Sequence, residues 1–303
     1  MPRFRLTVLA ALAAGLLATP AAAWTRPGHM VTAAIAYDDL AAHDAKVLDK
    51  VLDLLAAHPD KGPFEVAIGR TTGEAKQRRL FLEMARWPDD IRGGAYDHPT
   101  WHYAMKPVVD PASPPPRPPG PGLQGDAHEA FALNVRLAAD PRAAPSERAV
   151  ALCWVLHLMG DIHQPLHNAQ LFSAAFPEGD HGGGQTVIDP QTGLDISLHW
   201  FWDDSVNRLG EADPAVARGH ALEAALPRAG FPELAAPATP DRFPAWGAES
   251  YDLARTLAYR ADRLDGKRLN PAYVAEASAV AERRVALAGY RLADILRWIV
   301  AQA

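Results

Sequence analysis

Two histidine–aspartate pairs with the same spacing are the first candidates for chemistry in this chain. His157 and Asp161 lie in the apolar run 148–162, and His199 and Asp203 lie in the segment LHWFWD. In a helix, residues four apart lie on one face, one turn from each other. Polar groups on a buried helix need a partner, because an unpaired buried charge is costly. A metal ion would satisfy each pair, and a hydrogen-bonded His–Asp pair is the alternative.

Further donors stand close to these pairs in the sequence. His167 follows Pro165, which should end the first helix, so its side chain could enter the same cleft from another angle. His163 is off the face of His157 and Asp161, and we expect it to form hydrogen bonds instead. The fragments WPDDIR and WHY add Asp89 and His102. Taken alone, each of these is weak evidence for a metal site, and a capping or core role is the favoured interpretation.

The N-terminus supplies a donor of another kind. Arg3 and Arg5 precede an apolar stretch, 6–17, and the small residues 21–23. This pattern is typical of a signal peptide, and the stretch is shorter than the ~20 residues that span a bilayer. We therefore predict cleavage at Ala23/Trp24, a periplasmic or secreted protein, and no membrane anchor after cleavage. The free α-amine of Trp24 would titrate near pH ~8, and it could share a metal ion with His29.

These donors form a set of nine. They are Trp24, His29, Asp89, His102, His157, Asp161, His167, His199 and Asp203. All are nitrogen or oxygen donors, since the only cysteine, Cys153, lies in an apolar run and is expected in the core. Imidazoles with carboxylates suit zinc in catalytic sites, and nine donors exceed the needs of one tetrahedral ion. The set therefore predicts a zinc cluster.

Composition limits the function classes. The chain has 303 residues and a net charge of −6, which would become −8 without the leader. It therefore lacks the basic surface of a typical nucleic-acid-binding protein, and metal ions would have to attract any polyanion. Residues 24–303 show no clear linker, so we expect one domain.

The elements that must position these residues are mostly helices. Apolar residues recur with helical spacing, and alternating β-branched runs are few. The fold class predicted is all-α, with the third helix ending near Pro88. Helices are expected over 29–42, 46–57, 74–87, 127–139, 146–162, 197–207, 245–262 and 271–300. Irregular loops are expected over 107–122 and 227–244, and a loop or small hairpin over 181–194.

Taken together, the motifs resemble the zinc-dependent, single-strand-specific nucleases of fungi, plants and bacteria (the nuclease S-one/P-one type), and we expect a bacterial member. The resemblance runs through WPDDIR, WHY, HLMGDIHQPLH, DHGGG and LHWFWD, and ends with WGAES and AGYRLA. It implies the mainly helical fold of the zinc phospholipases C, with long loops around a trinuclear metal cleft.

The resemblance also implies three Zn²⁺ ions and their ligands. The first ion would be held by Asp89, His102, His157 and Asp161. The second would be held by the amine and carbonyl of Trp24, by His29 and by Asp161, which bridges. The third would be held by His167, His199 and Asp203. Asp89, Asp161 and Arg92 would be catalytic, with Arg92 contacting phosphate, although a surface ion pair is the alternative for Arg92.

The implied activity is hydrolysis of single-stranded DNA and RNA to 5′-nucleotides, together with 3′-nucleotidase activity, by a monomer. A hydroxide bridging two zinc ions would attack phosphorus. Tyr103 would stack on a base, or else be a core aromatic, and Gly183 and Gln185 would contact substrate. Met105 stands where many relatives have an Asp or Asn that orients the attacking water, so activity could be reduced.

Two other functions remain open. A phospholipase C on the same scaffold would use the same cluster, but that branch typically has a glutamate where this chain has Asp203. The other alternative, suggested by Met105, is an exported zinc-binding protein with weak or no catalysis.

Overall fold

The computed structural model describes residues 24–120, 122, 124–206, 211–260, 264–265 and 267–303. The predicted leader, 1–23, and its cleavage therefore lie outside the described residues. Within them the chain is mainly helical, as predicted. The helices are α1 (Arg26–His43), α2 (Ala45–Leu55), α3 (Gly62–Ile68), α4 (Gly73–Asp90), α5 (Ala127–Ala139), α6 (Pro145–Asp161), α7 (Leu198–Asp203), α8 (Ala212–Ala225), α9 (Phe243–Leu253) and α10 (Pro271–Gln302).

The strands are short and occur in pairs. β1 (Lys106–Val109) is parallel to β2 (Ala169–Phe172). Most of β1 lies in the segment 107–122, for which the sequence predicts an irregular loop. β3 (Val187–Ile188) and β4 (Ile196–Ser197) are antiparallel, as are β5 (Leu264–Asp265) and β6 (Arg268–Leu269). Short 3₁₀ turns interrupt the predicted loop 227–244, and the 3₁₀ turn η1 (Pro165–His167) follows α6.

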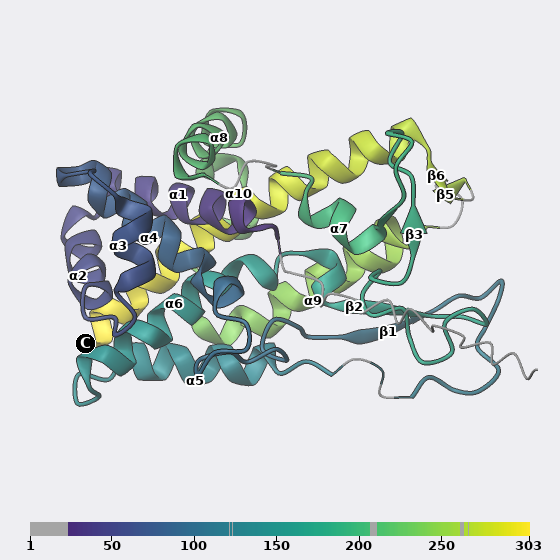
Figure 1. The fold of residues 1–303 in the computed structure, drawn as a ribbon, viewed down its shortest axis with the longest axis horizontal. Helices are drawn as coiled ribbons and strands as arrows, with labels where there is room; N and C mark the ends of the chain where they lie inside the picture. The colour runs from purple at the N-terminus through teal and green to yellow at the C-terminus, as the bar shows by residue number, and fades with distance from the viewer. Residues whose placement is uncertain (1–23, 121, 123, 207–210, 261–263, 266) are drawn as a thin grey trace, which may run out of the picture.

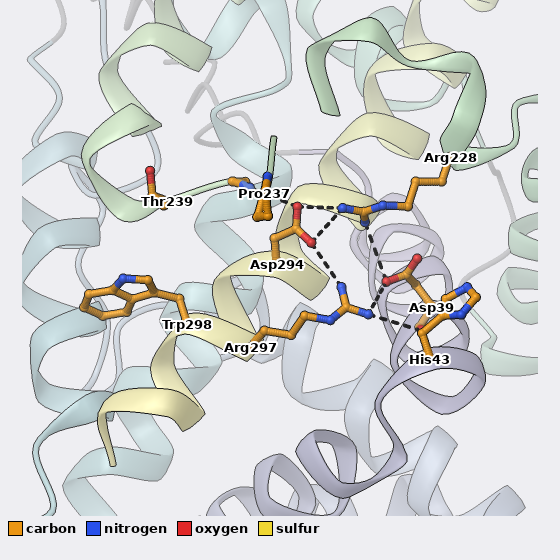
Figure 2. A pocket seen from close by; sticks show the side chains of 9 residues that line it. Asp39, His43, Arg228, Pro237, Thr239, Asp294, Arg297 and Trp298 are labelled. Atoms are coloured by element: carbon orange, nitrogen blue, oxygen red, sulfur yellow. Dashed lines mark hydrogen bonds and ion pairs between the residues drawn. The ribbon is translucent and has the colours of Figure 1, made fainter. Parts of the chain in front are cut away.

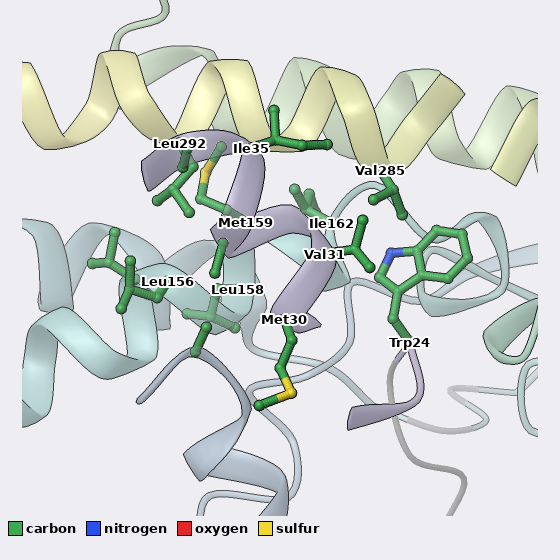
Figure 3. Packing of buried hydrophobic residues seen from close by; sticks show 14 of the residues in the cluster. Trp24, Met30, Val31, Ile35, Leu156, Leu158, Met159, Ile162, Val285 and Leu292 are labelled. Carbon is green, nitrogen blue, oxygen red and sulfur yellow. The ribbon is translucent and has the colours of Figure 1, made fainter. Parts of the chain in front are cut away.

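The core surrounds α1. Figure 3 shows Val31 and Ile35 of α1 between Leu156 and Met159 of α6 on one side and α10 on the other. All of these side chains are fully buried or nearly so. α10 runs along most of the length of the molecule, and α8 lies over α1 (Figure 1). None of the described helices is both long enough and apolar enough to cross a membrane. The donors at the start of α1 and the end of α6 are thus held by one continuous core.

Two helices, α3 and α8, were missed from the sequence. α8 contains Pro214 and Gly219, both of which disfavour helix interiors. Pro214 falls in the first turn, where its missing N–H has no intrahelical partner to lose. Gly219 allows α8 to approach α1, since a Cβ there would lie 3.0 Å from the Cβ of Ala34. Close packing therefore outweighs the low helix propensity.

Several predicted helix boundaries also differ. α4 continues through Pro88 to Asp90, because the proline lies in the last turn, and so Asp89 is a helical residue. α6 begins at Pro145, a favoured first residue, and not at a Ser146 cap. α7 ends at Asp203, α9 begins at Phe243, and the predicted ends at Asn207 and Asp262 lie outside the described residues.

A cleft of about 550 Å³ lies where α10 meets α1. Figure 2 shows Arg228 and Arg297 between the carboxylates of Asp39 and Asp294. Arg228 donates to both oxygens of Asp294 at 2.7 Å, and Arg297 lies 2.8 Å from Asp39 and 3.0 Å from Asp294. These ion pairs connect α1 with α10. Because the charges neutralise one another, Arg228, Arg297, Asp39 and Asp294 offer no unpaired charge to a ligand in this cleft.

His58, in the loop after α2, packs against α4, the helix that carries Asp89. Its ring packs edge-on against Phe64 and against Trp87 of α4, with centroids 5.1 and 4.5 Å away. Its Nδ1 accepts a hydrogen bond from the backbone N–H of Asp60. Burial lowers the pKa of His58 to about 4. The folded protein therefore holds this imidazole neutral, whereas the unfolded chain protonates it near its ordinary pKa of 6.5.

We expect His58 to make the protein less stable in acid. Because the folded pKa is depressed, its contribution is complete above pH ~6.5 and is lost as the pH falls towards 4. By linkage it should cost about 2 kcal/mol of unfolding free energy between pH 7.5 and pH 5. In His58→Asn, which keeps an acceptor near Asp60, this part of the pH dependence should disappear. Urea unfolding of both proteins at the two pH values measures it, and equal pH dependence would contradict the assignment.

Candidate metal centre

The predicted donors converge from distant parts of the chain. His29 lies in α1, Asp89 in α4, His157 and Asp161 at the end of α6, and His199 and Asp203 in α7. His102 lies in the loop before β1, and His167 lies in the turn after α6. All eight are buried, and the most exposed, Asp89, shows only 5% of its surface. Such a concentration of ionisable groups in the interior requires compensating charge.

Asp161 stands at the middle of this group. Its Oδ2 lies 3.1 Å from Nδ1 of His102 and 3.3 Å from Nε2 of His157. Its Oδ1 lies 3.4 Å from Nε2 of His29 and 3.6 Å from Nδ1 of His167. Each carboxylate oxygen therefore faces a different set of imidazoles, which is the arrangement that a bridging ligand needs.

Two groups of possible ligands share this region. Asp89, His102 and His157 offer atoms within 4.8 Å of one another, and so do His29, His157 and Asp161. The rings of His29 and His157 stack, with centroids 3.7 Å apart. The structure thus brings together the donors that were predicted for the paired ions, apart from the Trp24 amine.

A third group contains His167, His199 and Asp203, again with ligand atoms within 4.8 Å of one another. Nε2 of His199 lies 3.3 Å from Oδ2 of Asp203. The other oxygen of Asp203 accepts a hydrogen bond of 2.6 Å from the side-chain amide of Gln164. Burial raises the pKa of Asp203 well above its ordinary value and lowers that of His167 to about 3. Asp203 and His167 therefore both favour their neutral forms.

Backbone carbonyls orient three of the imidazoles. Nδ1 of His157 donates to Ala85 at 2.9 Å, that of His167 donates to His102 at 2.8 Å, and that of His199 donates to Gly182 at 2.7 Å. A carbonyl only accepts, so the proton must sit on Nδ1 in each ring. Nε2 is then left as the electron-pair donor, as in metal-binding histidines whose other nitrogen is held by a carbonyl.

Several buried atoms in these groups have no hydrogen-bond partner. They are both ring nitrogens of His29, Nε2 of His102 and His167, and one carboxylate oxygen each of Asp89, Asp161 and Asp203. Buried polar atoms are almost always hydrogen-bonded, so a concentration of unpaired ones requires an explanation. Nitrogen and oxygen donors in this mixture fit divalent zinc, and cations bound among these groups would satisfy the carboxylate oxygens and one nitrogen of each ring.

The electrostatics divide the centre into two parts. Burial raises the pKa of Asp161, but the neighbouring imidazoles His157 and His167 outweigh it and hold that pKa well below its usual range. For Asp89, too, burial is outweighed by His157 and His102, and the pKa is lowered. For Asp203, burial and the nearby carboxylates of Asp89 and Asp161 prevail, and the pKa is raised. The paired region thus favours ionised carboxylates, and the third group depends most on an added cation.

Trp24 is fully buried beside these donors. Its indole N–H donates to the carbonyl of Gly160 at 2.9 Å. A Cβ on Gly160 would lie 2.7 Å from Nδ1 of His29 and 3.5 Å from the Trp24 ring, so the glycine is needed for their close approach. The residue after the predicted cleavage site is therefore fixed next to His29.

The structure places the remaining predicted residues around these groups. Arg92 is partly exposed and donates to Oδ1 of Asp89 at 2.9 Å. Tyr103 is buried, with 6% of its surface exposed, and its ring lies 4.8 Å from that of His167, which favours the core role over base stacking. Gln185 is exposed. Met105 lies near Gly182, where a Cβ would meet its methyl group at 2.9 Å.

Two structural roles were not found from the sequence. Gln164 holds Asp203 although they are 39 residues apart, and only its place in the HQPLH motif pointed to it. Gly182 and Gly183 adopt φ values of 64° and 83°, which favour glycine, and a Cβ on Gly183 would lie 3.1 Å from the backbone nitrogen of His199. In the structure these glycines shape the loop that orients His199.

Comparisons with known proteins agree with this geometry. The chain is similar to Endonuclease 3 of Arabidopsis thaliana, with 31% identity over 163 residues, which are 49% of this chain and 51% of that protein. It is also similar to Endonuclease 5 of the same plant, with 29% identity over 49% of this chain and 50% of that protein. The chain therefore spans about half the length of the curated relatives that it matches. The family model described as S1/P1 Nuclease matches residues 24–301, and the chain belongs to this family.

Proposed function

We propose that the three groups of buried donors hold three Zn²⁺ ions. The observation that carries the proposal is the set of unpaired nitrogen and carboxylate atoms directed into one region. Asp89, His102, His157 and Asp161 would hold one ion, and His29, Asp161 and the Trp24 amine and carbonyl a second. His167, His199 and Asp203 would hold the third. The exact number of ions and the role of Trp24 are parts of this proposal.

We infer that the protein is a phosphodiesterase. Zinc ions would supply an acidified water as nucleophile and stabilise the negative charge that develops on phosphate. Around them, Asp161 would fix the distance within the pair, and Asp89 would hold Arg92 through their 2.9 Å contact. The guanidinium, partly exposed at this edge, could turn from Asp89 to a phosphate oxygen.

The substrate that we propose is single-stranded DNA and RNA, cleaved to 5′-nucleotides, with 3′-nucleotides as further substrates. Family membership and the names of the two endonucleases support a nucleic-acid substrate. The net charge of −6 is compatible with it if the metal cluster supplies the attraction for phosphate. Gly183 and Gln185 remain proposed substrate contacts, and base stacking by Tyr103 would require its ring to become exposed.

We further propose an exported monomer that forms one domain over residues 24–303. The pattern at residues 1–23 supports cleavage of a leader at Ala23/Trp24, and the match of the family model from residue 24 to residue 301 supports a single domain.

The first prediction compares substrates. We expect zinc-loaded protein beginning at Trp24 to hydrolyse single-stranded DNA and RNA to products with 5′-phosphates, and to leave phosphatidylcholine intact. Chromatography of the products and a lipid assay on the same preparation measure both activities. Turnover of the lipid alone would favour a phospholipase C. If neither nucleic acid nor 3′-nucleotides were hydrolysed between acidic and neutral pH, the protein would be a non-catalytic zinc binder.

The second prediction concerns Gly160. We expect Gly160→Ala to lower zinc affinity at the paired site by at least about tenfold, or 1.4 kcal/mol, because the new methyl group would displace the ring of His29. Gly230→Ala is the matched control, since nothing lies within 4 Å of a Cβ there. Zinc content after dialysis against a weak chelator measures the difference. Equal zinc retention by the two variants would show that His29 is not a zinc ligand.

The third prediction concerns the amine. A protein with one alanine left before Trp24 should lose the amine as a ligand and retain less zinc than the protein that begins at Trp24. The control carries the extra alanine after the exposed Ala303. Metal analysis of the three proteins measures the effect. Full zinc content in the N-terminally extended protein would refute the role of the amine.

A further inference from the structure

The motifs WGAES and AGYRLA have no role in the site described so far. The first, Trp246–Ser250, lies in α9, and the second contains Arg291 of α10. They meet, with Arg284 of α10, at the turn after α6. This turn runs from Asp161 to His167, so both of its ends belong to the proposed metal centre.

The contact joins two buried guanidinium groups to one partly exposed carboxylate. Arg284 and Arg291 are 4% and 3% exposed, and one carboxylate, that of Glu249, faces both. Glu249 accepts one hydrogen bond from Arg284 and two from Arg291, all at 2.8 Å. We call Glu249, Arg284 and Arg291 the arginine clamp. Because two guanidinium groups share one carboxylate, their other N–H groups need neutral acceptors.

Those acceptors belong to the turn or contact it. Nε of Arg284 donates to the carbonyl of His163 at 3.2 Å, and its Nη2 donates to Oγ of Ser250 at 2.8 Å. Ser250 in turn donates to the carbonyl of Ile162 at 2.6 Å. Nη1 of Arg291 donates to Nε2 of His163 at 2.9 Å, and Nδ1 of His163 then donates to the carbonyl of Met159 at 2.7 Å.

The end of α6 explains why these bonds matter. The last carbonyls of a helix have no intrahelical partner, and here they are buried. His163 satisfies one of them, on Met159. Ser250 and Arg284 satisfy the next two carbonyls along the chain, on Ile162 and His163 in the turn. The backbone of the turn is thereby held by side chains of α9 and α10.

The turn carries or contacts proposed ligands of more than one ion. It begins at Asp161, whose two oxygens face different imidazoles, and it ends at His167. Between them, the amide of Gln164 donates to Asp203 at 2.6 Å, and its oxygen accepts from the backbone of Leu166. A shift of the turn would therefore move Asp161, His167 and Asp203 together.

We propose that Glu249, Arg284 and Arg291 are positioning residues, which set the spacing between the paired ions and the third ion by fixing the turn 162–166. This inference rests on the proposed metal centre, and it assigns a function to the two unexplained motifs. None of the three residues is proposed to touch metal or substrate.

The test is Co²⁺ binding, followed by visible absorption, which reports ligand geometry without any substrate. Arg291→Met should weaken Co²⁺ binding by about 10- to 100-fold, the usual effect of losing a residue that orients ligands, and should change the spectrum. Arg291→Lys, which keeps the charge, should recover part of the affinity. The matched control is Arg297→Met, which breaks the ion pairs of α10 with Asp39 and Asp294 in the cleft of Figure 2.

The control should lower the melting temperature but keep the wild-type spectrum and affinity. If Arg291→Met does not fold, Ser250→Ala, which removes the bridge from Arg284 to the carbonyl of Ile162 but leaves the clamp residues in place, should still weaken binding and alter the spectrum. Folded clamp variants with wild-type Co²⁺ binding would overturn the proposal. If the wild-type protein itself bound no Co²⁺, the metal centre would be refuted, whereas binding without hydrolysis of nucleic acid would refute only the proposed reaction.

Discussion

The structure depends on the burial of one carboxylate, that of Asp161, among four imidazoles. Its contacts with His29, His102, His157 and His167 all lie between 3.1 and 3.6 Å. Such a group is costly to bury unless positive charge accompanies it. Burial lowers the pKa of His157, but Asp161 and Asp89 outweigh burial and raise it, so a protonated His157 would supply some of this charge. The unpaired atoms of Asp89 and Asp203 remain. Divalent cations account for both observations, and they also supply the chemistry that phosphodiester hydrolysis requires.

The rest of the fold holds these donors in place by close packing. α1 is enclosed by α6 and α10, so the donors at its start and those at the end of α6 belong to one packed core (Figures 1 and 3). Carbonyls hold three imidazoles by Nδ1, and glycines at positions 160 and 183 permit contacts that any Cβ would block. Arg284 and Arg291 of the arginine clamp bind the turn that joins the two parts of the centre, through His163. These contacts orient the candidate ligands.

Local features of the sequence predicted much of this arrangement. The spacing of His157 with Asp161 and of His199 with Asp203 placed each pair on one helical face, and the structure agrees. What local patterns could not supply were contacts between distant segments, such as Gln164 with Asp203 or Arg291 with His163. α8 was missed because Pro214 and Gly219 argue against a helix until their packing is known. The burial of Tyr103 likewise depends on His167, which is remote in sequence but lies against its ring.

The central claim is that nine donors from separate segments form three zinc sites. Anomalous diffraction at the zinc absorption edge, from crystals of protein that begins at Trp24, tests it most directly. We predict three zinc peaks: one among Asp89, His102, His157 and Asp161, one between His29 and the Trp24 amine, and one among His167, His199 and Asp203. Fewer than three peaks, or a peak not bounded by these residues in place of one of them, would contradict the account.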